Sequence, residues 1–139
     1  MSETEKQLQA YLYEFKILES QMNEITTQRE MLIRTLMEMR GGLSTLQGLD
    51  KLSSFEILVP IGGGVFVNAN TPPSDKFLVG IGANVIVEKN KEDAVKYVES
   101  RVNEIENAVK GIDAHRVDLN NNLKFIRETI NGIMTKQQG

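Results

Sequence analysis

The chain has 139 residues, a formal net charge of −3, and neither cysteine nor tryptophan. Without cysteine it can form no disulfide framework and no thiolate metal site, which suits a reducing, cytoplasmic setting. It has no dense Lys/Arg block, no apolar run near the roughly 18–20 residues that span a membrane, and no apolar signal region in its polar N-terminus MSETEKQLQA. We therefore expect neither nucleic acid nor a membrane as a partner.

Residues 3–48 are predicted to form one long helix whose apolar positions recur at alternating steps of three and four. That period is typical of a coiled-coil seam rather than of the face of a globular helix. Gly41-Gly42 is a weak point, since each glycine costs about 1 kcal/mol relative to alanine. The seam stays in phase beyond this pair, so we expect a bend or a frayed turn there, and the helix end at Gly48. The seam runs through Leu8, Tyr11, Phe15, Leu18, Met22, Ile25, Arg29, Leu32, Leu36, Met39, Leu43 and Leu46.

Residues 55–89 change to a β pattern, rich in β-branched and aromatic side chains. Strands are expected at 55–61, 65–70, 77–81 and 84–88. Short gaps at Gly62-Gly63-Gly64 and Gly82-Ala83 predict two successive hairpins, with the proline-containing segment 71–75 as the loop between them. Pro60 lacks an N–H donor and should lie at a sheet edge or a bulge.

Residues 90–137 are predicted to form a second helix. Asn90 is the expected N-cap, with Glu92 and Asp93 in the first turn. Since the β segment returns the chain, the two helices can zip together antiparallel. The second seam runs through Val98, Val102, Ile105, Val109, Ile112, Arg116, Leu119, Leu123, Ile126, Ile130 and Ile133.

The two seams predict which residues face each other across the coiled coil. The polar exceptions, Arg29 and Arg116, fall in one layer, so their stems should pack while their charged heads reach outward to carboxylates or water. This layer is either a tolerated wet layer or a device that sets the register. The expected facing pairs are Leu46 with Val98, Met39 with Ile105, Leu32 with Ile112, Ile25 with Leu119, and Leu18 with Ile126.

No catalytic constellation stands out in the sequence. His115 is the single histidine and lies off the seam, so it cannot form a metal cluster. Gly62-Gly63-Gly64 is not followed by the Gly-Lys-Ser/Thr of a phosphate loop, and Gly80-Ile81-Gly82 lacks the third glycine of a dinucleotide-binding motif. No acid–base pair can be defended. We expect no enzymatic activity, no cofactor and no metal.

The two hairpins need cover that two coil ends cannot supply. Isolated hairpins are marginally stable in water, and their edges expose unpaired N–H and C=O groups. Pairing with hairpins of other subunits, closing a barrel, would cover them. The expected fold is therefore α+β, a long antiparallel two-helix coiled coil joined by two β-hairpins that pair with other subunits in a β-barrel hub. The assembly residues would be Ile57, Val59, Pro60, Gly62, Gly64, Phe66, Val79, Gly80, Gly82, Val85 and Val87.

The free end of the coiled coil is the second candidate site. Seam residues lose their neighbours where the coil ends, and they would present apolar surface flanked by polar groups. They either merely finish the zipper or form a flexible hydrophobic grip. The residues concerned are Leu8, Tyr11, Leu12, Phe15, Ile126, Ile130, Ile133 and Met134.

Three segments carry a family resemblance. Leu58–Val67 reads LVPIGGGVFV, Val79–Val85 reads VGIGANV, and Glu88–Ala94 reads EKNKEDA. Between two heptad helices, these segments closely resemble the alpha subunits of the archaeal prefoldin family, whose pattern is L-V-P-[IV]-G-x-G-x-[FY] followed by V-G-x-G-x-x-[VI]. The resemblance covers the whole architecture, and two hairpins fit the alpha class rather than the beta class. The chain departs from the family at Gly63, often alanine, and in the helical Gly41-Gly42.

The resemblance implies an ATP-independent molecular chaperone that holds unfolded polypeptides. Family members assemble as a hexamer of two alpha and four beta subunits, bind clients at the coiled-coil tips, and pass them to a group II chaperonin. The implied partners are therefore prefoldin beta subunits, unfolded client proteins and that chaperonin. A prefoldin-like, gamma-type filament former is the alternative, and an adaptor coiled coil that recruits one folded partner is a third hypothesis.

Overall fold

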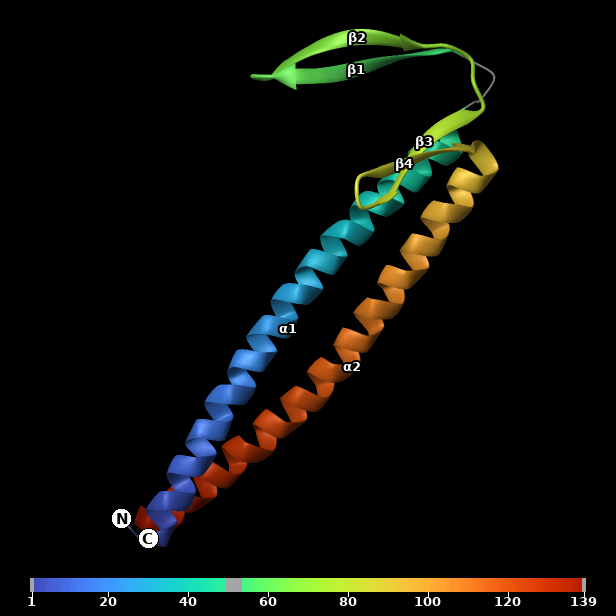
Figure 1. The fold of residues 1–139 in the computed structure, drawn as a ribbon. Coiled ribbons are helices and arrows are strands. Elements are labelled where there is room, and N and C mark those ends of the chain that lie inside the picture. Colours follow the sequence, from blue (N-terminus) through green and yellow to red (C-terminus); the bar gives the residue numbers. More distant parts are fainter. Residues whose placement is uncertain (1, 50–53, 139) are drawn as a thin grey trace. The chain divides into compact units, whose positions relative to one another are not determined.

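The computed structural model describes residues 2–49 and 54–138, in the order α1–β1–β2–β3–β4–α2 (Figure 1). This confirms the predicted α+β fold class, with two long helices bracketing two antiparallel hairpins. The chain divides into two compact units, one containing the residues up to Met37 and from Glu104 onward, the other Glu38–Asn103. The elements are α1 Glu3–Gly48, β1 Phe55–Gly62, β2 Val65–Thr71, β3 Lys76–Gly82, β4 Val85–Asn90 and α2 Lys91–Gln138.

Side-chain caps define where both helices begin. The Asn90 side-chain oxygen accepts a hydrogen bond of 2.8 Å from the backbone N–H of Asp93, which confirms the predicted N-cap of α2. At α1, the Ser2 hydroxyl accepts from the N–H of Glu5 at 3.2 Å. Helix α1 stays α-helical through Gly41-Gly42, where we expected a bend or a frayed turn, and it ends at Gly48.

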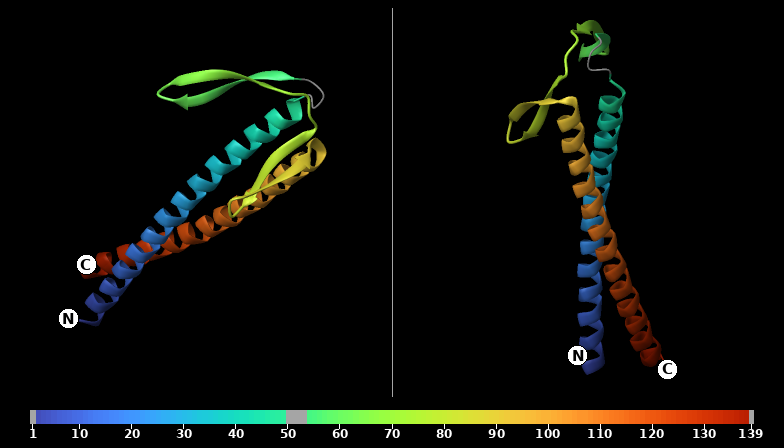
Figure 2. Two further views of the ribbon diagram at one scale, coloured as in Figure 1. Left: turned by 45° about the horizontal axis from the view of Figure 1, so that its top comes forward. Right: turned by 90° about the vertical axis from the view of Figure 1, so that its right-hand side faces the viewer.

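The first unit is an antiparallel pair of helices, which we call the distal coil. Its α1 and α2 segments lie side by side, with the start of α1 and the end of α2 at the same end (Figures 1 and 2). Every predicted seam position in both helices is buried or half-buried, so the heptad interpretation is confirmed. A two-helix coil has a core only one layer thick. The buried side chains of this unit are Ile25, Leu36, Ile105, Val109, Leu119, Leu123, Ile126 and Ile130.

The second unit, Glu38–Asn103, contains both hairpins. Strands β1 and β2 form one antiparallel two-stranded sheet, and β3 and β4 form another. At the tip of the second hairpin, Ala83 and Asn84 have φ of +52° and +61°. Positive φ at both central residues is typical of the type I′ turn, which connects tight hairpins. Consequently β4 begins at Val85, one residue later than predicted.

The described residues leave both hairpins largely uncovered. All residues of β1–β4 are described, and none of them is buried. Even large apolar side chains such as Leu58, Phe66 and Ile86 are more than half exposed. Among the described residues, the hairpins therefore contribute little core of their own, and their apolar side chains lie open.

Candidate functional site

The tip of the distal coil is formed by residues 2–18 and 125–138. The residues predicted to bind clients there differ in their exposure to solvent. Leu12 and Met134 are exposed, whereas Leu8, Tyr11, Phe15 and Ile133 are half-buried. Ile126 and Ile130 have exposed fractions of only 4% and 8%. The expectation that these two isoleucines present apolar surface is therefore corrected. They complete the core, because the α1 segment still covers them at this level of the coil.

Three exposed apolar side chains at the tip were missed by the sequence analysis. Tyr13 and Phe125 are 70% and 65% exposed, and Ile17 is also exposed. They lie off the seam, at positions where a coiled coil ordinarily carries polar residues, and the seam pattern passes over them. A search for large apolar residues at non-seam positions would have found them.

Phe125 borders a shallow groove between the two helices. Tyr11, Glu14 and Leu18 of α1 line it together with Asn122, Phe125 and Ile126 of α2. Leu18 and Ile126 thus line the same groove from opposite helices, in agreement with their predicted pairing. One turn further out, the Arg127 guanidinium lies 5.7 Å from the centre of the Phe15 ring, a cation–π contact that joins the two helices. The tip is therefore an apolar surface with polar groups interleaved.

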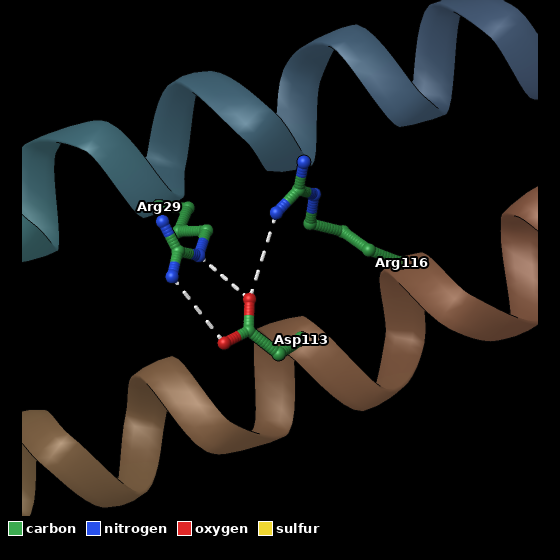
Figure 3. A network of polar contacts seen from close by, with 3 residues as sticks. All are labelled: Arg29, Asp113 and Arg116. Carbon is green, nitrogen blue, oxygen red and sulfur yellow. Dashed lines mark hydrogen bonds and ion pairs between the residues drawn. The ribbon is translucent and has the colours of Figure 1, made fainter.

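The middle of the distal coil holds the predicted polar layer (Figure 3). Arg29 Nε donates to Asp113 Oδ1 at 2.6 Å, and its Nη2 reaches Oδ2 at 3.4 Å. Arg116 Nη1 lies 3.6 Å from the same Oδ1. The prediction that the arginine heads reach a carboxylate is confirmed. The identity of that carboxylate was missed, although Asp113 precedes Arg116 by three residues, a spacing at which helical side chains meet.

Two cations share one anion in this layer. The Asp113 carboxylate accepts hydrogen bonds from Arg29, and this contact, with the nearby charge of Arg116, holds the pKa of Asp113 below its ordinary value of 3.8. Arg116 Nε is buried without a hydrogen-bond partner. Two guanidinium groups therefore face one carboxylate among these three side chains, and this arrangement favours the ionised form of Asp113.

The hairpins present the predicted assembly residues at their surface. Ile57, Val59, Phe66 and Val85 are exposed. Pro60, Gly62, Gly64, Gly80 and Gly82 are also exposed, while Val79 and Val87 are half-buried. Because each sheet has only two strands, every strand has one edge without a partner strand among residues 2–49 and 54–138. Pro60 lies beside a register irregularity in β1, where a bulge or edge was expected. Their role in assembly stays a prediction.

In the second unit, two hydrogen bonds join the start of α2 to the end of α1. Lys91, at the start of α2, donates through Nζ to the backbone oxygen of Gln47 at 3.2 Å and to that of Leu49. These carbonyls at the end of α1 have no partner within the helix, so the ammonium group caps them. A groove lined by Leu46, Val98 and Tyr97 from the helices and by Phe77 and Val79 from β3 lies nearby. Sequence periodicity gave no signal for the Lys91 contact.

Within residues 2–49 and 54–138, no group of three or more His, Asp or Glu side chains could hold a metal ion. His115 lies in a groove beside Gln21, Glu24 and Gln28, which offers no second imidazole. None of the helices, over their described residues, is long and apolar enough to cross a membrane.

Two long helices with two antiparallel β-hairpins between them define the class, an α+β coiled-coil protein. The family model for the prefoldin subunit matches residues 18–136. The chain belongs to the prefoldin family. It is therefore a chaperone-type subunit, since prefoldin family proteins are chaperones rather than enzymes.

Individual relatives support this assignment. Prefoldin subunit alpha 1 of Thermococcus kodakarensis is 33% identical over 105 residues, which cover 75% of this chain and 72% of that protein. Prefoldin subunit alpha of Methanocorpusculum labreanum is 31% identical over 138 residues, covering 96% and 89%. Prefoldin subunit alpha of Nitrosopumilus maritimus is 26% identical over 135 residues, covering 97% and 93%.

Solved structures show the same fold. The prefoldin beta subunit from Thermococcus strain KS-1 superposes with a TM-score of 0.65 at 17% identity, covering 91% of this chain and 90% of that one. Filamentous PFD from Methanocaldococcus jannaschii gives a TM-score of 0.55 at 24% identity, covering 87% and 95%.

Proposed function

We propose that this chain is an ATP-independent holdase subunit of a cytoplasmic hetero-hexamer, two alpha with four beta subunits. Its distal tip binds unfolded polypeptides, which the complex then delivers to a group II chaperonin. The observation that carries this proposal is the set of exposed apolar side chains at the tip. They are Leu12, Tyr13, Ile17, Phe125 and Met134.

The tip suits weak and reversible binding. Covering the exposed part of one such side chain contributes about 1–2 kcal/mol, too little to hold a client alone. Several arms that act on one polypeptide raise the effective concentration of each further contact, so the assembled complex can hold what one arm releases. Holding a non-native chain in this way competes with its aggregation. No step in this scheme requires nucleotide.

Assembly with other subunits would cover the hairpins. Their free strand edges expose main-chain N–H and C=O groups that another strand can satisfy, and their apolar faces are open. The curated relatives described above are named alpha subunits, and one superposed structure is a beta subunit. These likenesses support a hetero-oligomer. The filament-forming alternative is not favoured.

Suppression of client aggregation without nucleotide tests the proposal. The complex is assembled from beta subunits and either the wild-type chain or the variant Tyr13→Ser/Ile17→Ser/Phe125→Ser, and light scattering of a diluted unfolded client is followed. A control carries Met31→Ser/Met37→Ser/Val117→Ser, which removes three apolar side chains, each more than half exposed, away from the tip. We expect protection to fall for the tip variant and to persist for the control.

Two outcomes would contradict the proposal. Equal protection by the tip variant and the wild type would remove the tip from client binding. Equal loss in both variants would mean that any exposed apolar side chain on the coil serves. Delivery is measured separately, as transfer of a labelled client from the complex to a group II chaperonin, and it should also fail for the tip variant because less client is loaded.

A further inference from the structure

The two hairpins repeat one sequence pattern. Glu56–Asn70 reads EILVPIGGGVFVNAN, and Lys76–Asn90 reads KFLVGIGANVIVEKN. Of these 15 aligned positions, 7 are identical. The identical pairs are Leu58 and Leu78, Val59 and Val79, Ile61 and Ile81, Gly62 and Gly82, Val65 and Val85, Val67 and Val87, and Asn70 and Asn90.

The strand pairing repeats in the same way. Val59 pairs with Val67 in the first hairpin, and Val79 pairs with Val87 in the second. Each hairpin has one register irregularity, between Pro60 and Gly62 in the first and at the equivalent place, between Gly80 and Gly82, in the second. The irregularity therefore leaves one extra residue at the same point of both first strands.

The hairpin tips share one backbone conformation. Gly62 and Gly82 both have φ of +110°. The next two residues have φ of +61° and +78° in the first hairpin, and of +52° and +61° in the second. Glycine adopts such angles freely, whereas alanine and asparagine do so at a cost. The second tip nevertheless keeps the geometry with Ala83 and Asn84, so the shared shape is not a by-product of shared glycines.

Both hairpins also leave the same surfaces free. Each is a two-stranded sheet, and both of its outer edges are unpaired within the part of the chain that the structure describes. At equivalent places near the tips, Val65 and Val85 are exposed to almost the same extent, 53% and 48%. An unpaired strand edge is satisfied by another strand, and an apolar sheet face by another apolar face. A hairpin with one apolar face supplies both.

We propose that β1–β2 and β3–β4 are two copies of one docking module, each accepting the same kind of partner, an apolar-faced β-hairpin of another subunit, in the same register. The inference rests on the proposed assembly with other prefoldin subunits. It adds that the two modules are interchangeable, because their register, bulge and tip are the same.

The positions at which the modules differ adjust each contact without changing its register. The first residue of the repeat is Glu56 in one module and Lys76 in the other, so the two present opposite charges at the same place. Pro60 has no N–H to offer, whereas the equivalent Gly80 retains one. Neither difference alters the side-chain alternation that decides which face meets the partner.

Module duplication tests the proposal. In one variant, residues 76–90 are replaced by the sequence of residues 56–70, and in a second variant the replacement is reversed. Both keep the chain length, and both keep asparagine at the N-cap of α2, because Asn70 and Asn90 are equivalent. Each variant is mixed with the beta subunit of the same source organism, and native mass and apparent affinity are measured. We expect complexes of wild-type mass with affinities within about tenfold of wild type.

Smaller changes keep the proposal testable if a duplicated hairpin misfolds. The double variant Pro60→Gly/Gly80→Pro exchanges the main backbone difference, and a Cβ at Gly80 would meet nothing within 4 Å. The single variants Val65→Lys and Val85→Lys place the same charge on equivalent faces. We expect the exchange to assemble, and the two lysine variants to weaken assembly by similar factors.

Specific results would overturn the inference. One is a helical, folded duplication or exchange variant that forms no complex although the wild type does. Another is a large loss of affinity for only one of the two lysine variants. Either result leaves the holdase proposal intact, since the wild-type complex still forms. Conversely, the duplicated complex can reach the correct mass while both it and the wild-type complex fail to protect clients. That result refutes the holdase proposal and not the module equivalence.

Discussion

Single alanine substitutions at Phe125 and Ile126 should produce opposite effects, although the two residues are neighbours. Phe125 is 65% exposed at the rim of the tip groove, while Ile126 is 4% exposed in the core. The helix turns adjacent residues by about 100°, so one faces solvent and the other faces α1. The pair therefore separates a binding role from a packing role at one level of the coil.

The magnitudes follow from burial. Complete burial of a large apolar side chain contributes about 1.5–3 kcal/mol, and only about a third of Phe125 is covered, so Phe125→Ala should cost about 0.5–1 kcal/mol of unfolding free energy. Ile126→Ala removes a fully packed side chain and leaves a cavity, which typically costs about 2–5 kcal/mol. In client binding the order should reverse. Loss of the exposed Phe125 surface should weaken each contact by about 1–2 kcal/mol, or roughly five- to thirtyfold.

Two assays on the same variants decide the matter. Urea unfolding followed by circular dichroism gives the stability change, and suppression of client aggregation by the assembled complex, below the unfolding midpoint of each variant, gives the binding change. Phe125→Ala should lose protection with nearly normal stability. Ile126→Ala should lose stability while its folded fraction still protects. If Phe125→Ala protects as well as the wild type, or if it destabilises as much as Ile126→Ala, the assignment of Phe125 to the client surface is wrong.

Three further predictions concern the polar layer, the second hairpin and the helix junction. The lowered pKa of Asp113 means that its ionised form stabilises the folded state. This contribution is fully present well above pH 3.8 and is lost as the pH falls through the folded pKa, which lies below that value. Asp113→Asn should therefore have a lower melting temperature than wild type at pH 7. The difference in melting temperature should shrink below pH 3.8, and a difference that grows in acid would contradict this. Ala83→Gly should stabilise the second hairpin by about 0.5 kcal/mol, because φ of +52° strains alanine. Amide exchange measures this change, and lower protection of the hairpin N–H groups in the variant would refute the strain argument. Lys91→Met should speed amide exchange in the last turn of α1 but leave the Asn90-capped start of α2 unchanged, whereas unchanged exchange in α1 would show that the ammonium cap contributes nothing.

Much of this architecture could be predicted because its signals are local and periodic. The 3.5-residue repeat marked both seams, and every marked position proved buried or half-buried. Glycine, proline and β-branched residues marked two hairpins, and Asn90 followed by acidic residues marked the start of α2. Even the arginine layer was predictable, since two polar exceptions at matching seam positions must meet when the helices zip together.

Other features depended on which surfaces meet in space. Whether a seam residue near the tip is open or covered depends on how far the opposing helix extends beside it, and this placed Ile126 in the core. Phe125 and Tyr13 lie outside the seam, so periodicity treated their positions as polar. Asp113 and Lys91 gained their roles from atoms far away in the chain, Arg29 and the last carbonyls of α1.

The amino-acid sequence by itself determined the helices, the hairpins, their order and the family, because period, turn chemistry and capping act over a few residues. Only the tertiary structure decided which apolar side chains remain open at the tip, which carboxylate the two arginines share, and that both hairpins keep one register and one tip geometry. These properties depend on pairing between distant segments, and free energies of burial and ion pairing are set by the neighbours that such pairing brings together.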